Sequence, residues 1–270
     1  MPLGLRDLDE TQAPLLDHLI ELRGRLVKAV LALLLAFAVC FYFADRIFGF
    51  LVRPLTRAFP EGQGQLIYTR LYEAFFVEIK VALFAAFFLA FPIIANQLWG
   101  FVAPGLYKTE KKAFLPFLIA TPVLFFAGGA LAYYVVMPLA FTWFLGFQGD
   151  AGGLQAQALP AMGDYLDLVM RFILAFGISF LLPVLLMLLN GAGLVSRGQL
   201  VAARRYIVVV VFVVAAIITP PDVISQLMLA APLLLLFEGS LLLMLLGERK
   251  AAKIAAEKSA SVPEAEKPAE

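Results

Sequence analysis

Long apolar runs alternate with short charged stretches along this chain. No charged residue occurs within residues 29–44, 81–107, 113–149 or 172–196, and two further runs cover residues 206–221 and 223–237. A helix needs about 20 mainly apolar residues to cross a bilayer. The pattern therefore predicts six membrane-spanning helices, at about residues 23–44, 75–98, 113–137, 164–190, 204–218 and 223–246.

The spans are expected to be helices and not strands. A lone strand cannot satisfy its backbone groups in hydrocarbon, and the chain lacks the alternating segments of about 10 residues that build a membrane barrel. We expect an all-α polytopic membrane protein, with a single six-helix domain over residues 1–246 and a charged cytoplasmic tail over residues 247–270 that starts as a short helix and fades into disorder. The third span should end near the break at residues 136–138 and lead into an interfacial loop.

Charge placement predicts how these helices cross the membrane. Of the 21 Lys and Arg residues, 15 lie in the N-terminal segment, in the loops after the second and fourth spans, or in the tail. Cytoplasmic segments carry such an excess, so both termini are expected in the cytoplasm. The first 20 residues are acidic and lack the basic leader of a cleavable signal peptide, so the first span should remain as an anchor.

Composition argues against several classes of function. The chain is 62% hydrophobic and 15% charged, whereas soluble domains have about 45–50% and about 25%. One cysteine and one histidine leave no material for an internal disulfide, a cysteine metal cluster or a histidine-based catalytic centre. The net charge of +1 gives no net electrostatic pull toward nucleic acid or anionic lipid, so any basic patch must come from local placement. No phosphate-binding loop occurs. We expect no enzyme activity, no catalytic or metal-binding residue, no cofactor and no nucleic-acid partner.

The segment after the first span has an amphipathic pattern. Ile47, Leu51 and Leu55 recur at helical spacing, and arginines occupy positions between them. This pattern favours a helix that lies on the outer membrane surface, with a simple connecting loop as the alternative.

Two charged residues fall at or within apolar runs. Lys80 stands at the start of the second span and is expected to anchor it at the interface. Glu238 lies deep in the last run, where an ionised carboxylate facing lipid is costly. We expect Glu238 to face the bundle, a wet cavity or the cytoplasmic interface.

Three separated strings carry more information than the composition does. Residues 18–23 read HLIELR, residues 99–110 read WGFVAPGLYKTE and residues 219–226 read TPPDVISQ. Together with the six-span layout, they resemble the TatC family over about residues 14–246. TatC proteins are the polytopic receptor subunits of the twin-arginine protein translocase. The resemblance implies a multi-pass protein of the bacterial inner membrane that serves folded cargo and uses the transmembrane proton gradient.

The resemblance also implies a binding site for twin-arginine signal peptides. In the family, the cytoplasmic N-terminal segment and the first cytoplasmic loop bind the paired arginines, and the matching acids here are Glu21 and Glu110. A guanidinium is a planar fork that a carboxylate accepts through two hydrogen bonds. The other expected members of the site are Arg23, Phe101, Pro104, Leu106, Tyr107 and Lys108. The apolar ones would form a wall along which the peptide packs, and the cations would hold the acids in place. On the residues alone, Glu110 would more simply pair with neighbouring lysines.

A second polar group is expected on the outer side. Thr219, Asp222 and Gln226, together with Pro54 of the first outer loop, are candidates for contact with the family's single-span subunits TatA and TatB. The alternative for residues 219–222 is a tight Pro-Pro hairpin cap, and both interpretations can hold. Other copies of the chain and membrane lipid complete the expected partners.

One position departs from the family pattern. The family often carries an acid after a Gly-X-Ser-Phe-like string in the fourth span, but here Leu181 follows Phe180. A mechanism that relies on a buried carboxylate at that point is therefore in doubt for this chain.

The fifth span is expected to be too short for the membrane. Between Arg205 and the turn at Thr219 it has 13 residues, which at about 1.5 Å each reach roughly 20 Å, against a hydrocarbon core of about 30 Å. Short fifth and sixth spans would form one low wall of a concave bundle and thin the bilayer beside it. The alternative is that the fifth span starts near Leu200 and tilts.

A secondary transporter of a small solute is the alternative function. Six spans, broken helices and an intramembrane Glu would also suit such a protein. No repeated pattern is evident between the two halves of the sequence, which disfavours it. An intramembrane hydrolase lacks a Ser/His or paired-Asp constellation.

Overall fold

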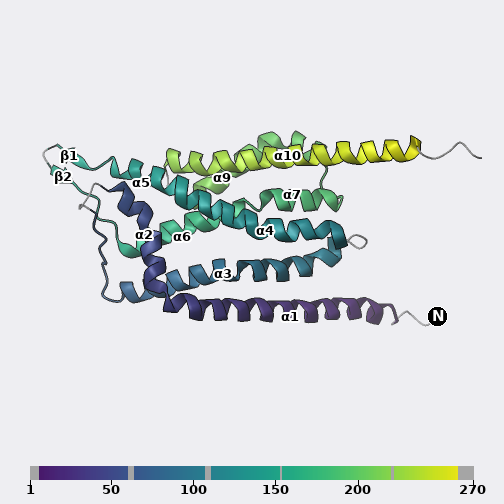
Figure 1. The fold of residues 1–270 in the computed structure, drawn as a ribbon, viewed down its shortest axis with the longest axis horizontal. Helices are drawn as coiled ribbons and strands as arrows, with labels where there is room; N and C mark the ends of the chain where they lie inside the picture. Colours follow the sequence, from purple (N-terminus) through teal and green to yellow (C-terminus); the bar gives the residue numbers. More distant parts are fainter. Residues whose placement is uncertain (1–5, 60–63, 107–110, 153, 220–221, 261–270) are drawn as a thin grey trace, which may run out of the picture. The chain divides into compact units, whose positions relative to one another are not determined.

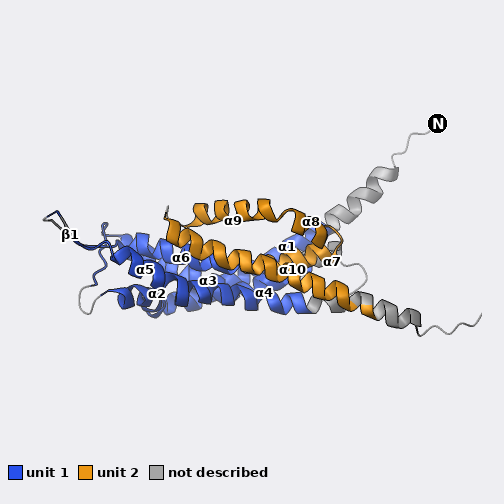
Figure 2. Cartoon of the chain, turned by 90° about the horizontal axis from the view of Figure 1, so that it is seen from above, with its two compact units in different colours: residues 1–179 blue, residues 180–270 orange. Residues whose placement is uncertain are grey.

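Helices account for almost all the regular structure of this chain, as the long apolar runs predict. The structure is a computed structural model that describes residues 6–59, 64–106, 111–152, 154–219 and 222–260. The chain forms two units, residues 1–179 and residues 180–270, which are coloured separately in Figure 2.

The elements of unit 1 are α1 (Arg6–Tyr42), α2 (Ala44–Ala58), α3 (Glu73–Leu106), α4 (Lys111–Leu131), the π-helical turn η1 (Ala132–Val136), α5 (Met137–Leu145), β1 (Gly149–Ala151), β2 (Leu154–Ala156) and α6 (Met162–Ser179). The two long helices α1 and α3 lie side by side and run in opposite directions (Figure 1).

Small side chains make the contact between α1 and α3. Ala36 and Cys40 of α1 pack with Ala82, Ala86 and Ala90 of α3 in one buried cluster. Membrane helices associate through van der Waals packing, and small residues let their backbones approach closely. This contact sets the register of α1 against α3.

The helix of the third apolar run does not end near residues 136–138 as predicted. It passes through η1 and continues as α5 to Leu145. Pro138 lies in the first turn after η1 and has no N–H to donate to a carbonyl of the preceding turn. The break is therefore a widened turn within a continuous helical segment.

A small antiparallel hairpin is an exception to the predicted all-helical fold. Strands β1 and β2 pair Gly149 with Ala156 and Ala151 with Leu154. Gly152 has φ +68°, a left-handed conformation that favours glycine. The hairpin occupies the stretch expected to be an interfacial loop.

Helix α2 confirms the amphipathic prediction. Leu51 and Leu55 are buried with Pro54 between them, and Arg53 is exposed. Pro54 lies inside the helix and has no N–H to donate to the carbonyl of Phe50, four residues earlier.

Two tyrosine hydroxyls satisfy the carbonyls of α2 instead. The hydroxyl of Tyr133, in η1, donates to the Phe50 carbonyl at 2.6 Å. The hydroxyl of Tyr165, in α6, donates to the Leu51 carbonyl at 2.8 Å. These bonds join α2 to segments that follow it by 83 and 114 residues.

Unit 2 is made of α7 (Leu182–Gly191), α8 (Arg197–Ala202), α9 (Arg204–Ile218) and α10 (Val223–Ala260). Its core joins Leu200 of α8 to Phe237, Leu241 and Met244 of α10. A turn at Ala203 separates α8 from α9, so the fifth apolar helix starts at Arg204 as predicted and not near Leu200.

The start of the predicted tail is helical. Helix α10 continues beyond Leu246 to Ala260, in the part of the tail where a short helix was expected before disorder. Alanine, lysine and glutamate, which dominate this stretch, are strong helix formers. Residues 261–270 lie outside the described residues.

Five helical segments in the described part of the chain are long and apolar enough to cross a membrane. They are His18–Tyr42, Glu73–Phe101, Pro116–Leu145, Met162–Gly191 and Val223–Lys250. Helix α9 is apolar but has only 15 residues, whereas α10 has 38 residues, so the expectation of a short sixth helix is wrong. The count of six spans, and the side on which the termini lie, remain predictions.

Candidate functional site

The HLIELR string at residues 18–23 and the start of the WGFVAPGLYKTE string at residues 99–110 meet where α1 packs beside the end of α3. The ring of His18 stacks on the ring of Phe101, with centroids 4.2 Å apart and planes 15° apart. These residues lie 83 positions apart in the chain. The packing of α1 on α3 therefore brings two of the predicted site segments together.

Glu21 is paired within the chain. The guanidinium of Arg25, one turn further along α1, donates to Oε1 of Glu21 from Nε at 2.9 Å and from Nη2 at 2.7 Å. Oε2 of Glu21 lies 3.9 Å from Nδ1 of His18. The Glu21 side chain is 39% exposed, so peptide from solution can reach it.

Arg25 was not among the predicted site residues. Its guanidinium lies against Gly100, where a Cβ atom would overlap Nη1. The spacing of Glu21 and Arg25, four residues apart on a helix, is the sequence signal for their pairing. The contact with Gly100 depends on how α1 and α3 are aligned, which no local pattern reveals. We call His18, Glu21, Arg25, Gly100 and Phe101 the entry patch.

The structure describes some of the remaining predicted site residues and not others. Arg23 is exposed on α1 and makes no ion pair within the described residues. Pro104 and Leu106 lie in the last turns of α3. Tyr107, Lys108 and Glu110 lie outside the described residues.

The end of α3 is also tied to α4. The indole N–H of Trp99 donates to the hydroxyl of Thr121 at 2.8 Å, and that hydroxyl donates to the Phe117 carbonyl at 2.7 Å. Thr121 is buried. Trp99 therefore fixes the α3 end of the predicted peptide loop, immediately beside Gly100.

The second predicted polar group lies in unit 2. The hydroxyl of Thr219 donates to the Ala215 carbonyl at 2.9 Å, and Asp222 Oδ1 accepts from the Ser225 N–H at 2.7 Å at the start of α10. The amide of Gln226 donates to the Phe212 carbonyl of α9 at 3.0 Å. These bonds match the hairpin-cap interpretation.

Two buried polar atoms in this group have no hydrogen-bond partner among the described residues. They are Oγ of Ser225, which is fully buried, and Oδ2 of Asp222. An unsatisfied buried polar atom costs about 1–3 kcal/mol, so this turn carries an energetic cost within the described part of the chain. Pro54, the fourth predicted member, belongs to α2 of unit 1 and is buried there.

Glu238 is paired at the start of α9. Its Oε2 accepts from Nη2 of Arg204 at 2.6 Å, and both side chains are about half exposed. Of the three expected locations, this pairing favours an interface, because Arg204 begins α9 in the predicted cytoplasmic loop.

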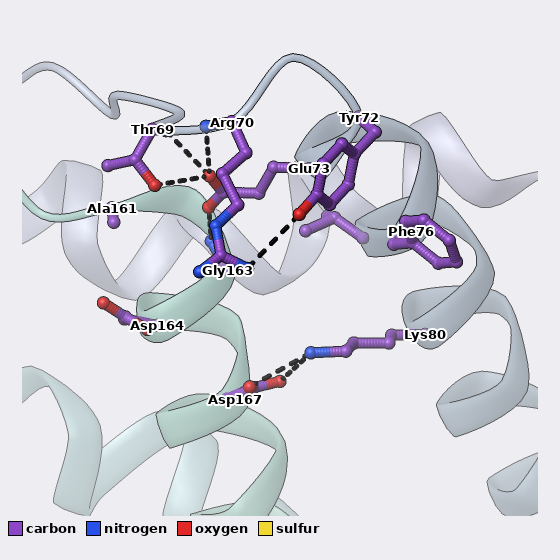
Figure 3. Close-up of a pocket in the computed structure, with 11 residues that line it drawn as sticks. Thr69, Arg70, Tyr72, Glu73, Phe76, Lys80, Ala161, Gly163, Asp164 and Asp167 are labelled. Carbon is purple, nitrogen blue, oxygen red and sulfur yellow. Dashed lines mark hydrogen bonds and ion pairs between the residues drawn. The ribbon is translucent and has the colours of Figure 1, made fainter.

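A charged pocket of about 480 Å³ lies between the starts of α3 and α6 (Figure 3). Glu73 accepts hydrogen bonds from the N–H groups of Thr69, Arg70 and Gly163 and from the Thr69 hydroxyl. A Cβ atom at Gly163 would lie 2.9 Å from the Glu73 carboxylate, so this approach needs glycine. The carboxylate therefore ties the first turn of α3 to the first turn of α6.

An ion pair also crosses this pocket. Nζ of Lys80 lies 2.9 Å and 3.1 Å from the two carboxylate oxygens of Asp167 (Figure 3). Lys80 was expected to act as a lone anchor at the interface, and Asp167 was not singled out. The residues are 87 positions apart, so only the packing of α3 against α6 reveals the pair.

The chain is similar to one family over most of its length. Residues 17–232 match the family model described as Sec-independent protein translocase protein (TatC). The Sec-independent protein translocase protein TatC of Magnetococcus marinus is 53% identical over 195 residues, which are 72% of this chain and 70% of that protein. The Escherichia coli protein of the same name is 38% identical over 189 residues, which are 70% and 71% of the two chains. A crystal structure of the twin-arginine translocase receptor TatC in DDM has a TM-score of 0.74 and 39% identity, and covers 84% of this chain and 98% of that one.

Proposed function

Because the chain belongs to the TatC family of Sec-independent protein translocase proteins and is a multi-pass protein of the bacterial inner membrane, we propose that it receives twin-arginine signal peptides of folded proteins. The family assigns it to protein transport. The signal peptide, the partner subunits and the residues that bind them form the proposal.

One observation carries the proposal most directly. The stacking of His18 on Phe101 places an acid of the N-terminal segment, Glu21, beside the beginning of the peptide loop. A peptide with two adjacent arginines needs acceptors on one surface together with an apolar wall. The entry patch supplies the first acceptor and the first part of the wall, and Glu110 would supply the second acceptor.

Binding at Glu21 would proceed by exchange of guanidinium groups. Arg25 occupies Oε1, and an incoming arginine would take Oε2 or replace Arg25 altogether. An exposed pair four residues apart on a helix is worth only about 0.3–0.5 kcal/mol, so the exchange costs little. Arg23 and Lys108 would keep the acids oriented and repel cations that approach elsewhere.

The outer ends of α9 and α10 would receive a partner subunit. A TatA- or TatB-type helix with a polar group in its outer half would meet the partly exposed side chains of Asp222 and Gln226. Thr219 and Gln226 would keep the turn in shape through their own bonds to α9. Transport would draw on the proton gradient, with several copies of the chain in one complex.

The test is peptide binding by the purified full chain in nanodiscs. We expect a twin-arginine peptide to bind and a twin-lysine peptide to bind far more weakly. Charge-assisted hydrogen bonds contribute about 1.5–3 kcal/mol, so Glu21→Gln, Glu110→Ala and Glu110→Arg should each lower the affinity about tenfold to a hundredfold.

Asp45→Asn is the matched control, since it removes one exposed carboxylate in the first turn of α2, beyond the far end of α1. Unchanged affinity in Glu21→Gln and Glu110→Arg, with correct insertion, would remove these acids from the site. Equal binding of the two peptides would contradict the receptor function itself.

A further inference from the structure

An apolar pocket of about 290 Å³ lies against α2 in unit 1. Helix α2 contributes Phe50 to it, α3 contributes Phe88 and α4 contributes Ala130. Hydrocarbon and aromatic side chains make up nearly all of the lining, and such a pocket offers no partners to water. The pocket is open at its rim, because Phe50 and Ala130 are both exposed. In a membrane, the molecules that surround this rim are lipids.

The π-helical turn η1 forms one wall of this pocket. Tyr133 and Tyr134 are adjacent in the sequence, and both line the pocket. Tyr133 is buried, whereas Tyr134 is 62% exposed at the rim. π-helical turns are rare and are found mostly at functional sites, and the function proposed above makes no use of this one.

An exposed arginine face runs along α2 beside the pocket. Arg46, Arg53 and Arg57 are spaced seven and four residues apart, so they share one side of the helix, and all three are exposed. The Arg46 guanidinium lies 5.6 Å from the centre of the Phe43 ring, and that of Arg53 lies 5.8 Å from the centre of the Phe50 ring. Each distance is within the range of a cation–π contact. We call Arg46, Arg53 and Arg57 the arginine face.

A single stack joins the arginine face to the pocket. The Arg53 guanidinium lies over the Phe50 ring. The same ring stacks on the Tyr133 ring, with centroids 4.4 Å apart and planes 11° apart. The Tyr133 hydroxyl donates to the Phe50 carbonyl. Phe50 and Tyr133 both line the pocket. The stack therefore holds the Arg53 guanidinium beside the apolar wall of the pocket.

We propose that the arginine face and the apolar pocket together bind one anionic phospholipid. The phosphate binds the guanidinium groups of Arg46 and Arg53, and one acyl chain lies in the pocket. Guanidinium presents a donor fork that fits phosphate, and basic residues beside a membrane attract anionic lipid. The only acid among the described residues of α2 is Asp45, so the helix has a net positive charge that disfavours an additional ammonium group.

The two parts of the site have different roles. An acyl chain already lies in hydrocarbon, so entering the pocket gains little by transfer, and the pocket mainly determines where the chain lies. The headgroup preference then comes from the arginines. The volume is just below the lower limit of about 300 Å³ for small-molecule pockets, which fits a stretch of acyl chain better than a partner helix.

The experiment measures lipid retained by the full chain. The protein is placed in phosphatidylcholine nanodiscs that contain equal small amounts of phosphatidylglycerol and phosphatidylethanolamine, then transferred to detergent and weighed by native mass spectrometry. We expect one phosphatidylglycerol to be retained at least fivefold over phosphatidylethanolamine. Each arginine near the surface contributes about a fivefold preference, so Arg53→Gln and Arg46→Gln should each lower retention about fivefold.

Two further variants complete the test. Ala130→Leu fills the pocket from its rim and should lower retention without any change in charge. Arg70→Gln is the matched control, because Arg70 is an exposed arginine before α3 that does not line this pocket. Equal retention of the two lipids would overturn the proposal, as would equal losses in Arg53→Gln and Arg70→Gln, or full retention in Ala130→Leu. No signal peptide is present, so this result is independent of the receptor function.

Discussion

Arg25 places two N–H groups on a single carboxylate oxygen of Glu21, Oε1. The second oxygen, Oε2, faces the side of His18, whose ring lies on Phe101. The acid that the family resemblance assigns to peptide binding is therefore half occupied by a residue of its own helix. If a signal peptide binds at Glu21 as proposed, Arg25 would compete with the peptide's guanidinium for this carboxylate.

Removal of that competitor should tighten peptide binding. We expect Arg25→Gln to raise the affinity for a twin-arginine peptide about twofold, which corresponds to the small free energy of a partly exposed pair on one helix. Fluorescence anisotropy with a labelled peptide measures this change. Lys28→Gln, one turn further along α1, controls for the loss of one positive charge. Weaker binding in Arg25→Gln would show that Arg25 positions Glu21 and does not compete for it.

Gly100→Ala tests the same relationship from α3. Its Cβ atom would overlap the Arg25 guanidinium, so the side chain must move away from Glu21. We expect the affinity to change in the same direction and by a similar factor as in Arg25→Gln, in the same binding assay. Gly24→Ala is the control, because a Cβ atom at Gly24 meets nothing within 4 Å. An unchanged affinity in Gly100→Ala would show that Arg25 can move while it keeps its bond to Glu21.

Tyr133→Phe should destabilise unit 1. Pro54 leaves the Phe50 carbonyl without its helical donor, and the Tyr133 hydroxyl replaces that donor. Loss of this bond should cost about 1–1.5 kcal/mol, measured as a lower midpoint of thermal unfolding in detergent. Tyr134→Phe is the matched control, because Tyr134 is 62% exposed and has no hydrogen bond in the described structure. Equal midpoints for the two variants would exclude this role for the hydroxyl.

Lys80 and Asp167 should be energetically coupled. Their side chains are 50% and 37% exposed, which limits the coupling to about 1 kcal/mol in a watery surrounding. A double-mutant cycle with Lys80→Met and Asp167→Asn, followed by unfolding in detergent, measures it. Asp164→Asn changes another acid of the same pocket that forms no ion pair in the described structure, and should be near neutral. Additive effects of Lys80→Met and Asp167→Asn would show that the pair contributes nothing.

The predictable part of this fold is the part determined by local pattern. The long apolar runs specify the helices, and the spacing of Ile47, Leu51 and Leu55 specifies α2, because burial of one face decides the structure in both cases. The start of α9 at Arg204 and its end at Ile218 follow from charges and a proline turn beside it. The charged, alanine-rich start of the tail predicts a short helix, and α10 extends through it to Ala260.

The unpredictable part depends on alignment between distant segments. The Glu21–Arg25 spacing is visible in the sequence, but the contact of Arg25 with Gly100 requires the register of α1 on α3. The pairing of Lys80 with Asp167 likewise requires the packing of α3 on α6. A rotation of one residue in either helix pair would remove these contacts and leave the sequence pattern unchanged.

The last prediction concerns the length of α9. Its 15 residues reach about 22 Å at about 1.5 Å per residue, while the hydrocarbon core is about 30 Å thick. Spin labels at Tyr206, Val213 and Ile217, which are exposed, report their depth through collisions with oxygen in the lipid and a nickel chelate in water. We expect the labels at Tyr206 and Ile217 to lie at the two opposite membrane interfaces. The label at Val213, between them, should lie no farther from the nearer interface than about half the length of α9. A label at Ile217 that is buried at the bilayer centre would show that α9 does not span, and undisturbed lipid around a fully inserted α9 would exclude local thinning.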